Sequence, residues 1–420
     1  MCTVPSVPGL GDERARASGR RVPRWSDVRP LVRPRRFELD PVERRLARAA
    51  TIDDLRTIAK RRTPRAVFDY ADGAAEREIG LRRSREAFAR VELVPSMLHD
   101  VSHVDTSTTI LGRPSRLPLA FAPTGFTRLF HHEGERAVVR VAERNGIPAS
   151  LSTVGTTTIE DFAHEAPAAT KWFQLYVWRD RDKSAALVER ARAAGYDALL
   201  LTVDVPVAGS RLRDVYNGLV FPPELTARTL AGIARHPTWW LNVLTTEPLR
   251  FALIEEDLRT VARVADHLFD PAMTTADLTW LRELWKGPLV VKGILSADDA
   301  RRAVDLGADG VVVSSHGSRQ LDLGPTPLEA LPAVVEAVGD EAEVFLDSGI
   351  LSGIDVVSAV AMGARACLVA RAYCYGLMAG GERGVQRAVD ILRTEIVRTM
   401  ALLGVCAVSD LTPERARLRE

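Results

Sequence analysis

Eight short apolar runs recur along the chain from about residue 117, separated by stretches in which apolar residues return at helical spacing. The runs are 118–122, 148–152, 172–176, 198–202, 289–292, 310–313, 344–347 and 366–369. Segments such as 297–306 and 353–362 lie between them and have the period of amphipathic helices. Gly307 and Gly363 begin matching turns from a helix into the next run. Eight alternating β and α units predict a closed parallel TIM (β/α)8 barrel, with an open doubly wound α/β sheet as the less favoured alternative.

The N-terminal segment lacks this pattern. Residues 1–50 hold 12 Arg against 6 acidic residues, and they include few large apolar side chains. Such a segment cannot repay the entropy cost of ordering, so we expect an Arg-rich, mostly disordered arm. A solvated tail is favoured over an arm that binds anionic lipid or nucleic acid. Thr51 and Asp54 have the spacing of a capping box and predict the first helix of the folded domain.

The folded domain is expected to span residues 51–413, with a short tail at 414–420. Segment 217–270 interrupts the alternation after the fourth strand and contains Trp239 and Trp240. A long insertion at this place in a barrel is typical of a lid or of a surface for a partner.

Composition changes this picture little. The chain has 420 residues, 46% hydrophobic and 26% charged, with a net charge of +1, as in an ordinary soluble globular protein. That charge balance argues against nucleic acid as a partner. Cys2, Cys367, Cys374 and Cys406 have no metal-ligand spacing, so we expect reduced thiols, a cytoplasmic protein and no metal site. No stretch is apolar and long enough to cross a bilayer, and the first residues lack a signal-peptide core.

Polar side chains stand at or just after the ends of the predicted strands, where a TIM barrel gathers its functional residues. They are Thr124, Ser152, Gln174, Tyr176, Thr202, Asp204, Lys292, His316, Arg319, Asp347 and Arg371. Polar groups at all eight ends predict one site on the C-terminal face.

The segment 314–322, with the sequence SSHGSRQLD, directly follows the buried run 310–313. Its His316 is suited to move a proton near neutral pH, and its Arg319 offers a planar fork for a carboxylate. The pair predicts chemistry on a small organic acid. An ordinary loop with a structural His and a surface Arg is the alternative reading of this segment alone.

With these residues in order, the chain from about residue 51 to 413 resembles the FMN-dependent 2-hydroxy-acid oxidase and dehydrogenase family. That family includes glycolate oxidase, lactate oxidase, mandelate dehydrogenase and L-lactate dehydrogenase. The matching motifs lie at 67–70, 122–124, 173–176, 201–204, 291–293 and 314–322. Segments 151–154 and 211–214 are most similar to the quinone-linked L-lactate dehydrogenases.

The resemblance implies that the protein oxidises an L-2-hydroxy acid, L-lactate or a somewhat larger one, to the 2-oxo acid. His316 would be the base that takes either the hydroxyl or the α-carbon proton, and Asp204 would stabilise the imidazolium. Arg211 and Arg319 would bind the substrate carboxylate. The hydroxyls of Tyr70 and Tyr176 would orient the substrate, with Tyr176 among the catalytic groups.

The resemblance also implies FMN as the cofactor. Lys292 would lie at the pyrimidine edge of the flavin, and Ser152, Gln174 and Thr202 would hydrogen-bond its ring. The full set of implied cofactor-binding residues is Ala122, Pro123, Thr124, Ser152, Gln174, Thr202, Lys292, Ser314, Asp347, Ser348, Gly349, Ala370 and Arg371. Reoxidation by quinone or another carrier rather than oxygen, a homotetramer, and peripheral contact with the inner face of the membrane follow from the same resemblance.

Four residues depart from the family pattern. Ser315 replaces the usual Asn, and Val154 stands where glycolate oxidases carry a bulky aromatic, which predicts a substrate side chain larger than hydrogen. Leu351 replaces an Arg that contacts the FMN phosphate, and Ala370 replaces a Gly in the second phosphate-binding turn. Backbone N–H groups and Arg371 can still bind a dianion, although loss of one charged contact costs about 1.5–3 kcal/mol.

These departures keep two alternatives open. The chain could be a flavoenzyme that modifies a peptide-derived or other larger substrate. It could also be a catalytically impaired barrel that acts in binding, because a weaker phosphate site would lower flavin occupancy.

Overall fold

The computed structural model describes residues 22–31, 38–218, 232–254 and 270–419, in a chain that divides into the units Met1–Arg44 and Arg45–Glu420. In the first unit, helix α1 (Trp25–Val28) has no buried residue. Of the arm that was predicted to be disordered, residues 1–21 and 32–37 lie outside the described residues. Helix α2 (Pro41–Leu46) contains the boundary between the units.

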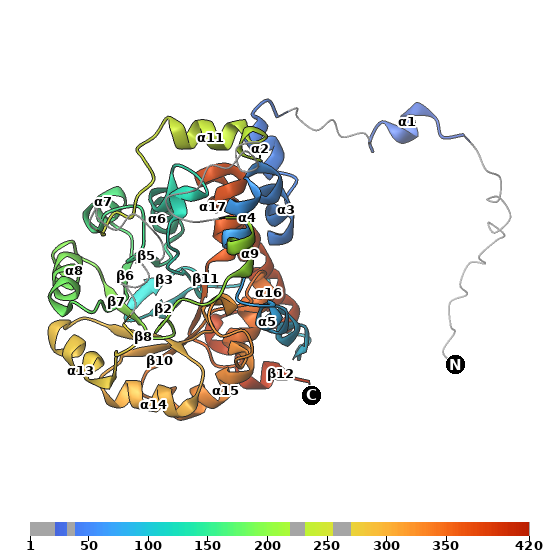
Figure 1. Ribbon diagram of the computed structural model, residues 1–420. Helices are drawn as coiled ribbons and strands as arrows, with labels where there is room; N and C mark the ends of the chain where they lie inside the picture. Colours follow the sequence, from blue (N-terminus) through green and yellow to red (C-terminus); the bar gives the residue numbers. More distant parts are fainter. Residues whose placement is uncertain (1–21, 32–37, 219–231, 255–269, 420) are drawn as a thin grey trace, which may run out of the picture. The chain divides into compact units, whose positions relative to one another are not determined.

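The second unit is built on a closed barrel of eight parallel strands, which confirms the TIM-barrel prediction (Figure 1). Around the barrel the strands follow one another in the order β10–β11–β4–β5–β6–β7–β8–β9. Their bounds are β4 (Leu119–Phe121), β5 (Ala149–Ser152), β6 (Lys171–Leu175), β7 (Ala198–Thr202), β8 (Leu289–Ile294), β9 (Gly310–Val313), β10 (Glu343–Leu346) and β11 (Ala366–Val369). Each corresponds to one of the eight predicted apolar runs.

Helices connect these strands and lie outside them (Figure 1). They are α6 (Gly134–Asn145), α7 (Ile159–Glu165), α8 (Arg181–Ala193), α9 (Leu212–Tyr216), α11 (Pro237–Leu244), α13 (Thr275–Leu284), α14 (Ala297–Asp305), α15 (Pro327–Val338), α16 (Gly353–Ala361) and α17 (Arg371–Leu403). Two antiparallel pairs complete the sheet structure: β1 (Val91–Leu93) with β12 (Ala416–Leu418), and β2 (Thr108–Ile110) with β3 (Arg113–Ser115).

The inside of the barrel is filled with apolar side chains. Trp172 and Phe345 meet across it with ring centroids 5.9 Å apart, and Leu200, Val290 and Val312 belong to the same buried cluster. A filled barrel leaves no room for a ligand between the strands, so a binding site has to form at the strand ends and in the loops that follow them.

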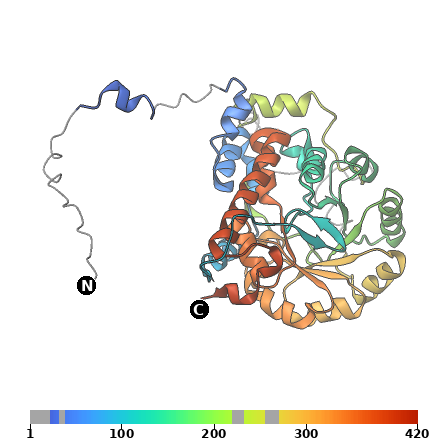
Figure 2. The ribbon, with the colours of Figure 1, turned by 180° about the vertical axis from the view of Figure 1, so that it is seen from behind.

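Between α2 and the barrel the chain forms the helices α3 (Ile52–Arg62), α4 (Arg65–Asp72) and α5 (Ile79–Ala89). The predicted capping box is confirmed, since the Thr51 side chain accepts a hydrogen bond from the Asp54 N–H and the Asp54 carboxylate accepts one from the Thr51 N–H. Helix α3 packs along α17, where the blue and red helices lie side by side in Figure 2. The compact unit starts at Arg45, six residues before Thr51, and Ala49 is already buried.

The predicted insertion is described in part. Residues 232–254 include α11, whereas 219–231 and 255–269 lie outside the described residues. Among the helices that the structure describes, none combines the length and the apolar character that crossing a membrane requires.

Candidate active site

A cavity of about 690 Å³ opens at the carboxyl ends of the barrel strands. With the exception of Asp204 and Ser314, every site residue that the sequence pattern and the resemblance indicate lines this cavity: Tyr70, Ala122, Pro123, Thr124, Ser152, Gln174, Tyr176, Thr202, Arg211, Lys292, His316, Arg319, Asp347, Ser348, Gly349, Ala370 and Arg371. Asp204 and Ser314 lie directly behind the lining, in contact with His316 and Lys292. The structure therefore brings the whole predicted set together.

His316 is held in one orientation by Asp204. Its Nδ1 lies 2.9 Å from Asp204 Oδ1, while Nε2 has no hydrogen-bond partner among the described residues. Burial alone would raise the pKa of Asp204, but His316 and Lys292 hold it below its ordinary value. An ionised carboxylate on Asp204 can only accept a hydrogen bond, so it favours the imidazole tautomer with its proton on Nδ1. In that tautomer Nε2 carries a lone pair and can take a proton.

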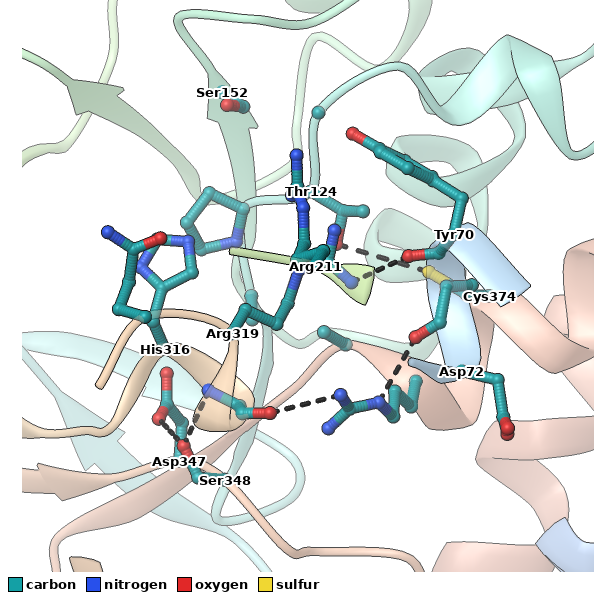
Figure 3. A pocket seen from close by; sticks show the side chains of 18 of the residues that line it. Tyr70, Asp72, Thr124, Ser152, Arg211, His316, Arg319, Asp347, Ser348 and Cys374 are labelled. Atoms are coloured by element: carbon teal, nitrogen blue, oxygen red, sulfur yellow. Dashed lines mark hydrogen bonds between the residues drawn. The ribbon is translucent and has the colours of Figure 1, made fainter. Parts of the chain in front are cut away.

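Arg319 and Arg211 face the same aromatic ring. Their guanidinium carbons lie 5.1 Å and 5.6 Å from the Tyr70 ring centroid, and the three side chains stand together in Figure 3. Burial, and next the neighbouring Arg211, lower the pKa of Arg319 to about 10. Because two cations that repel each other are stabilised by an anion between them, the arrangement is suited to a carboxylate.

Tyr176 lies at the same end of the cavity. Burial first, and then the Asp204 carboxylate, raise the pKa of its hydroxyl above the ordinary value. The hydroxyl therefore stays protonated at neutral pH.

Helix α9 holds Arg211 through contacts that the sequence reasoning missed. Asp214 Oδ2 lies 3.1 Å from Arg211 Nε. Arg213 forms ion pairs with the end of α4 and the start of α5: its Nη1 lies 2.9 Å from Asp72 Oδ2, and its Nη2 contacts the Glu78 carboxylate. The Arg-x-x-Asp spacing of Arg211 and Asp214 was a usable signal for the first pair. The partners of Arg213 are more than 130 residues away and had no such signal.

A row of side chains crosses the ends of three adjacent strands. Ser152 Oγ donates to Gln174 Oε1 at 2.9 Å, and Gln174 Nε2 donates to Thr202 Oγ1 at 3.0 Å. Ser152 and Thr202 are the last residues of β5 and β7, and Gln174 is the last residue but one of β6. The row presents fixed amide and hydroxyl groups to the cavity, as the polar edge of a flavin ring requires.

Lys292 supplies a buried cation next to that row. Its Nζ donates to Ser314 Oγ and pairs with Asp347 Oδ2, both at 2.8 Å. Burial would lower the pKa of Lys292, but Asp347 and Asp204 raise it above the ordinary value. The ammonium group has three donors and uses two of them in contacts with described residues, which leaves a third for a ligand within that part of the chain.

The turn after β10 has the geometry of an anion site. Ser348 and Gly349 both have positive φ, 72° and 87°. Ala370 gives α17 no side-chain cap, so the first N–H groups of that helix have no partner within it. Both segments line the cavity together with the polar row and Lys292, so the residues present fit a flavin ring that carries a phosphate.

Most of the N–H groups of Arg371 point to backbone carbonyls, so its guanidinium is not free to bind a phosphate with all of its donors. Its Nε donates to Ala71 O at 3.1 Å, and its Nη2 donates to Gly73 O at 2.9 Å and to Gly317 O at 3.0 Å. These bonds tie the active-site turn to the end of α4. They leave Nη1 as its remaining donor group for an anion among the described contacts.

The chain matches the protein-family model described as FMN-dependent dehydrogenase over residues 59–418. It is 54% identical over 397 residues to a Mycobacterium tuberculosis protein named "Putative L-lactate dehydrogenase", covering 94% of this chain and 96% of that protein. It is 43% identical over 365 residues to the L-lactate dehydrogenase of Caulobacter vibrioides, covering 85% and 95%.

Solved structures resemble it as well. The crystal structure of the monotopic membrane protein (S)-mandelate dehydrogenase superposes with a TM-score of 0.85 at 35% identity, covering 89% of this chain and 100% of that one. A soluble mutant of the membrane-associated (S)-mandelate dehydrogenase from Pseudomonas putida gives 0.75 at 37% identity, covering 88% and 99%.

The Lys292–Asp347 pair makes a stability prediction. Lys292→Met should lower the free energy of unfolding by about 3–5 kcal/mol, because it leaves the buried Asp347 carboxylate without its cation. The double variant Lys292→Met/Asp347→Leu should recover much of this loss. Denaturant unfolding measures both. Arg190→Ala, which removes an exposed pair with Glu160, is the control and should change stability by less than about 1 kcal/mol. A loss in Lys292→Met as small as the control would contradict the interpretation.

Proposed function

The chain belongs to the FMN-dependent dehydrogenase family and is an oxidoreductase that acts on the CH–OH group of 2-hydroxy acids; from this premise we propose that its substrate is L-lactate or a somewhat larger L-2-hydroxy acid. The observation that carries the proposal is the combination, in one cavity, of an oriented His316–Asp204 pair with two arginines about one tyrosine ring. A proton acceptor and a carboxylate site are the two features that a 2-hydroxy acid needs.

In this proposal His316 is the base. Asp204 holds the proton on Nδ1, so Nε2 takes a proton from the substrate, and the resulting imidazolium is stabilised by the carboxylate 2.9 Å away. The low pKa of Asp204 keeps the carboxylate ionised through the step and prevents it from drawing the proton off His316.

The substrate carboxylate lies between Arg211 and Arg319. Asp214 forms an ion pair with Arg211, 3.1 Å from its Nε, and Tyr70 O accepts a hydrogen bond from Nη1 of Arg319 at 2.6 Å. Each guanidinium is thereby held in place while other N–H groups remain for the substrate. The Tyr70 and Tyr176 hydroxyls orient the reacting end. Fixing the acid in this way removes part of the entropy cost of the reaction.

The residues of the polar row and Lys292 would hold the flavin ring, and the turns at 348–351 and 370–372 would hold its phosphate. FMN, when bound, supplies the acceptor for the two electrons that the substrate loses. The positive charge of Lys292 would stabilise the negative charge that the flavin ring gains when it is reduced.

Apolar side chains set the size of the substrate. Val154 and Phe126 line the cavity, and the ring of Phe251 from the insertion packs against that of Phe126 at an angle of 42°, with centroids 4.8 Å apart. Ala252 N donates to Gly155 O at 3.0 Å, so the insertion is tied to this wall. Val154 leaves more space than a bulky aromatic would, which favours a substrate with a methyl or longer side chain over glycolate.

A panel of 2-hydroxy acids tests the substrate. We expect anaerobic L-lactate or a longer L-2-hydroxy acid to bleach the flavin absorbance of the yellow protein, and D-isomers and glycolate to do so more slowly. The rate constant of bleaching at saturating acid is the measurement. Colourless protein that does not take up FMN would instead favour the impaired, ligand-binding barrel. Faster reduction by a peptide-derived substrate would favour the other alternative.

The role of His316 makes a second prediction. His316→Gln should retain bound flavin but slow its anaerobic reduction by substrate by about 100-fold to 10,000-fold, the usual contribution of general base catalysis. Stopped-flow absorbance measures it. His164→Gln changes an exposed histidine on α7 and should leave the rate unaltered. Reduction of the His316 variant at the unaltered rate would exclude this residue as the base.

We also propose that α11 contacts a lipid surface, which would give access to a quinone acceptor. The helix PTWWLNVL has no charged residue, and Leu241 and Leu244 are 47% and 74% exposed. Apolar side chains exposed on one helix are suited to the membrane interface.

Sedimentation with vesicles of phosphatidylcholine and phosphatidylglycerol tests this contact. Leu241→Ser/Leu244→Ser should release most of the bound protein, because both apolar side chains are lost. Leu402→Ser, at a leucine 68% exposed on α17, is the control and should sediment like the unaltered protein. Equal sedimentation of all three proteins would count against α11.

A further inference from the structure

The phosphate end of the cavity carries a negative charge of its own. Asp355 lies in the first turn of α16, is buried, and accepts a hydrogen bond at 2.9 Å from the Leu351 N–H. Leu351 itself lines the cavity with an apolar side chain. The turn 348–351 therefore contains no cation, and a dianion bound there would meet the field of the Asp355 carboxylate.

Arg85 reaches this turn from α5, outside the barrel. Its Nη1 donates to Gly349 O and, at 2.7 Å, to Asp355 Oδ2, and the residue lines the cavity. The guanidinium carbon also lies 5.8 Å from the Phe88 ring centroid, which fixes the side chain against its own helix. Arg85 is thus the ion-pair partner of Asp355 and a cation at the edge of the phosphate site.

Arg85 has donors to spare. In the described part of the chain, its hydrogen bonds all come from Nη1, so Nε and Nη2 are available to a ligand. Arg371 has fewer donors available, since its Nε and Nη2 form three hydrogen bonds with backbone carbonyls. Arg56 forms a two-bond pair with Asp72. A planar guanidinium with free N–H groups beside an anion site matches the geometry of phosphate binding.

We propose that Arg85 binds the phosphate of FMN and offsets the charge of Asp355 beside it. The cation of the phosphate site then comes from α5, before the barrel, rather than from the turn after β10. This assignment depends on FMN as the cofactor but on no particular substrate, because the phosphate is remote from the reacting atoms of any hydroxy acid.

Comparison of FMN with riboflavin, which lacks the phosphate, tests the role of Arg85. The full-length protein is equilibrated with either flavin, and free flavin is measured by its fluorescence after ultrafiltration. Arg85→Gln should raise the dissociation constant of FMN by about 10-fold to 100-fold, the effect of losing a charged hydrogen bond. The dissociation constant of riboflavin should change by less than about twofold, because the ring contacts remain.

Two further variants separate a phosphate contact from a structural one. Adding Leu351→Arg to Arg85→Gln places a cation on the same turn and should restore most of the FMN affinity. Arg82→Gln removes an exposed arginine of α5 that donates to Arg77 O, and should affect neither flavin. If Arg85→Gln does not fold, Arg85→Lys serves instead, with about a threefold loss for FMN alone.

An equal effect of the Arg85 change on both flavins, including no effect on either, would overturn the proposal. So would failure of Leu351→Arg to recover FMN affinity in a folded double variant. Neither result depends on turnover. The substrate panel can fail while FMN discrimination by Arg85 is still observed, so the two proposals can be judged apart.

Discussion

The site depends on a network of three largely buried charges of alternating sign, those of Asp347, Lys292 and Asp204. Asp347 pairs with Lys292, and Asp204, which pairs with His316, adds to the field that keeps Lys292 charged. Each of these charges would be costly to bury alone, so the network is stable only if the strands place all three side chains next to one another. The parallel barrel fixes this arrangement through its strand register, in which Lys292 lies opposite Thr202 of β7 on one side and opposite Val312 of β9 on the other. A slip by one residue would turn Lys292 away from both carboxylates.

The parts of the site that come from outside the barrel are fixed by ionic contacts over long sequence distances. Arg213 joins α9 to Asp72 and Glu78, which brings Arg211 to the ring of Tyr70. Arg371 joins the catalytic turn to the end of α4 through backbone carbonyls. The substrate end thus combines a packed scaffold, which supplies the base and the buried lysine, with helices that supply the carboxylate-binding groups. Arg85 plays the corresponding part at the phosphate end.

The pattern of apolar runs was sufficient to predict the fold, because fully buried parallel strands such as 310–313 and 366–369 must be continuously apolar. The polar residues directly after those runs were sufficient to indicate the cavity lining, because the carboxyl ends of all eight strands meet on one face of the barrel. Sequence could not predict how the side chains choose partners. Arg371 was expected to face the phosphate, yet most of its bonds go to carbonyls of segments near residues 71–73 and 317. Arg85 showed no signal, because its role arises only when α5 packs beside the turn after β10.

In the proposed mechanism, Arg211 and Arg319 bind the substrate carboxylate while Nε2 of His316 faces the reacting carbon and its oxygen. A crystal structure of the FMN-loaded protein with a bound 2-oxo acid product would show whether they do. We expect the carboxylate within hydrogen-bond distance of both guanidinium groups and the keto oxygen within reach of His316 Nε2 and a tyrosine hydroxyl. A product whose carboxylate lies away from the two arginines, or whose keto group faces away from His316, would contradict this mechanism.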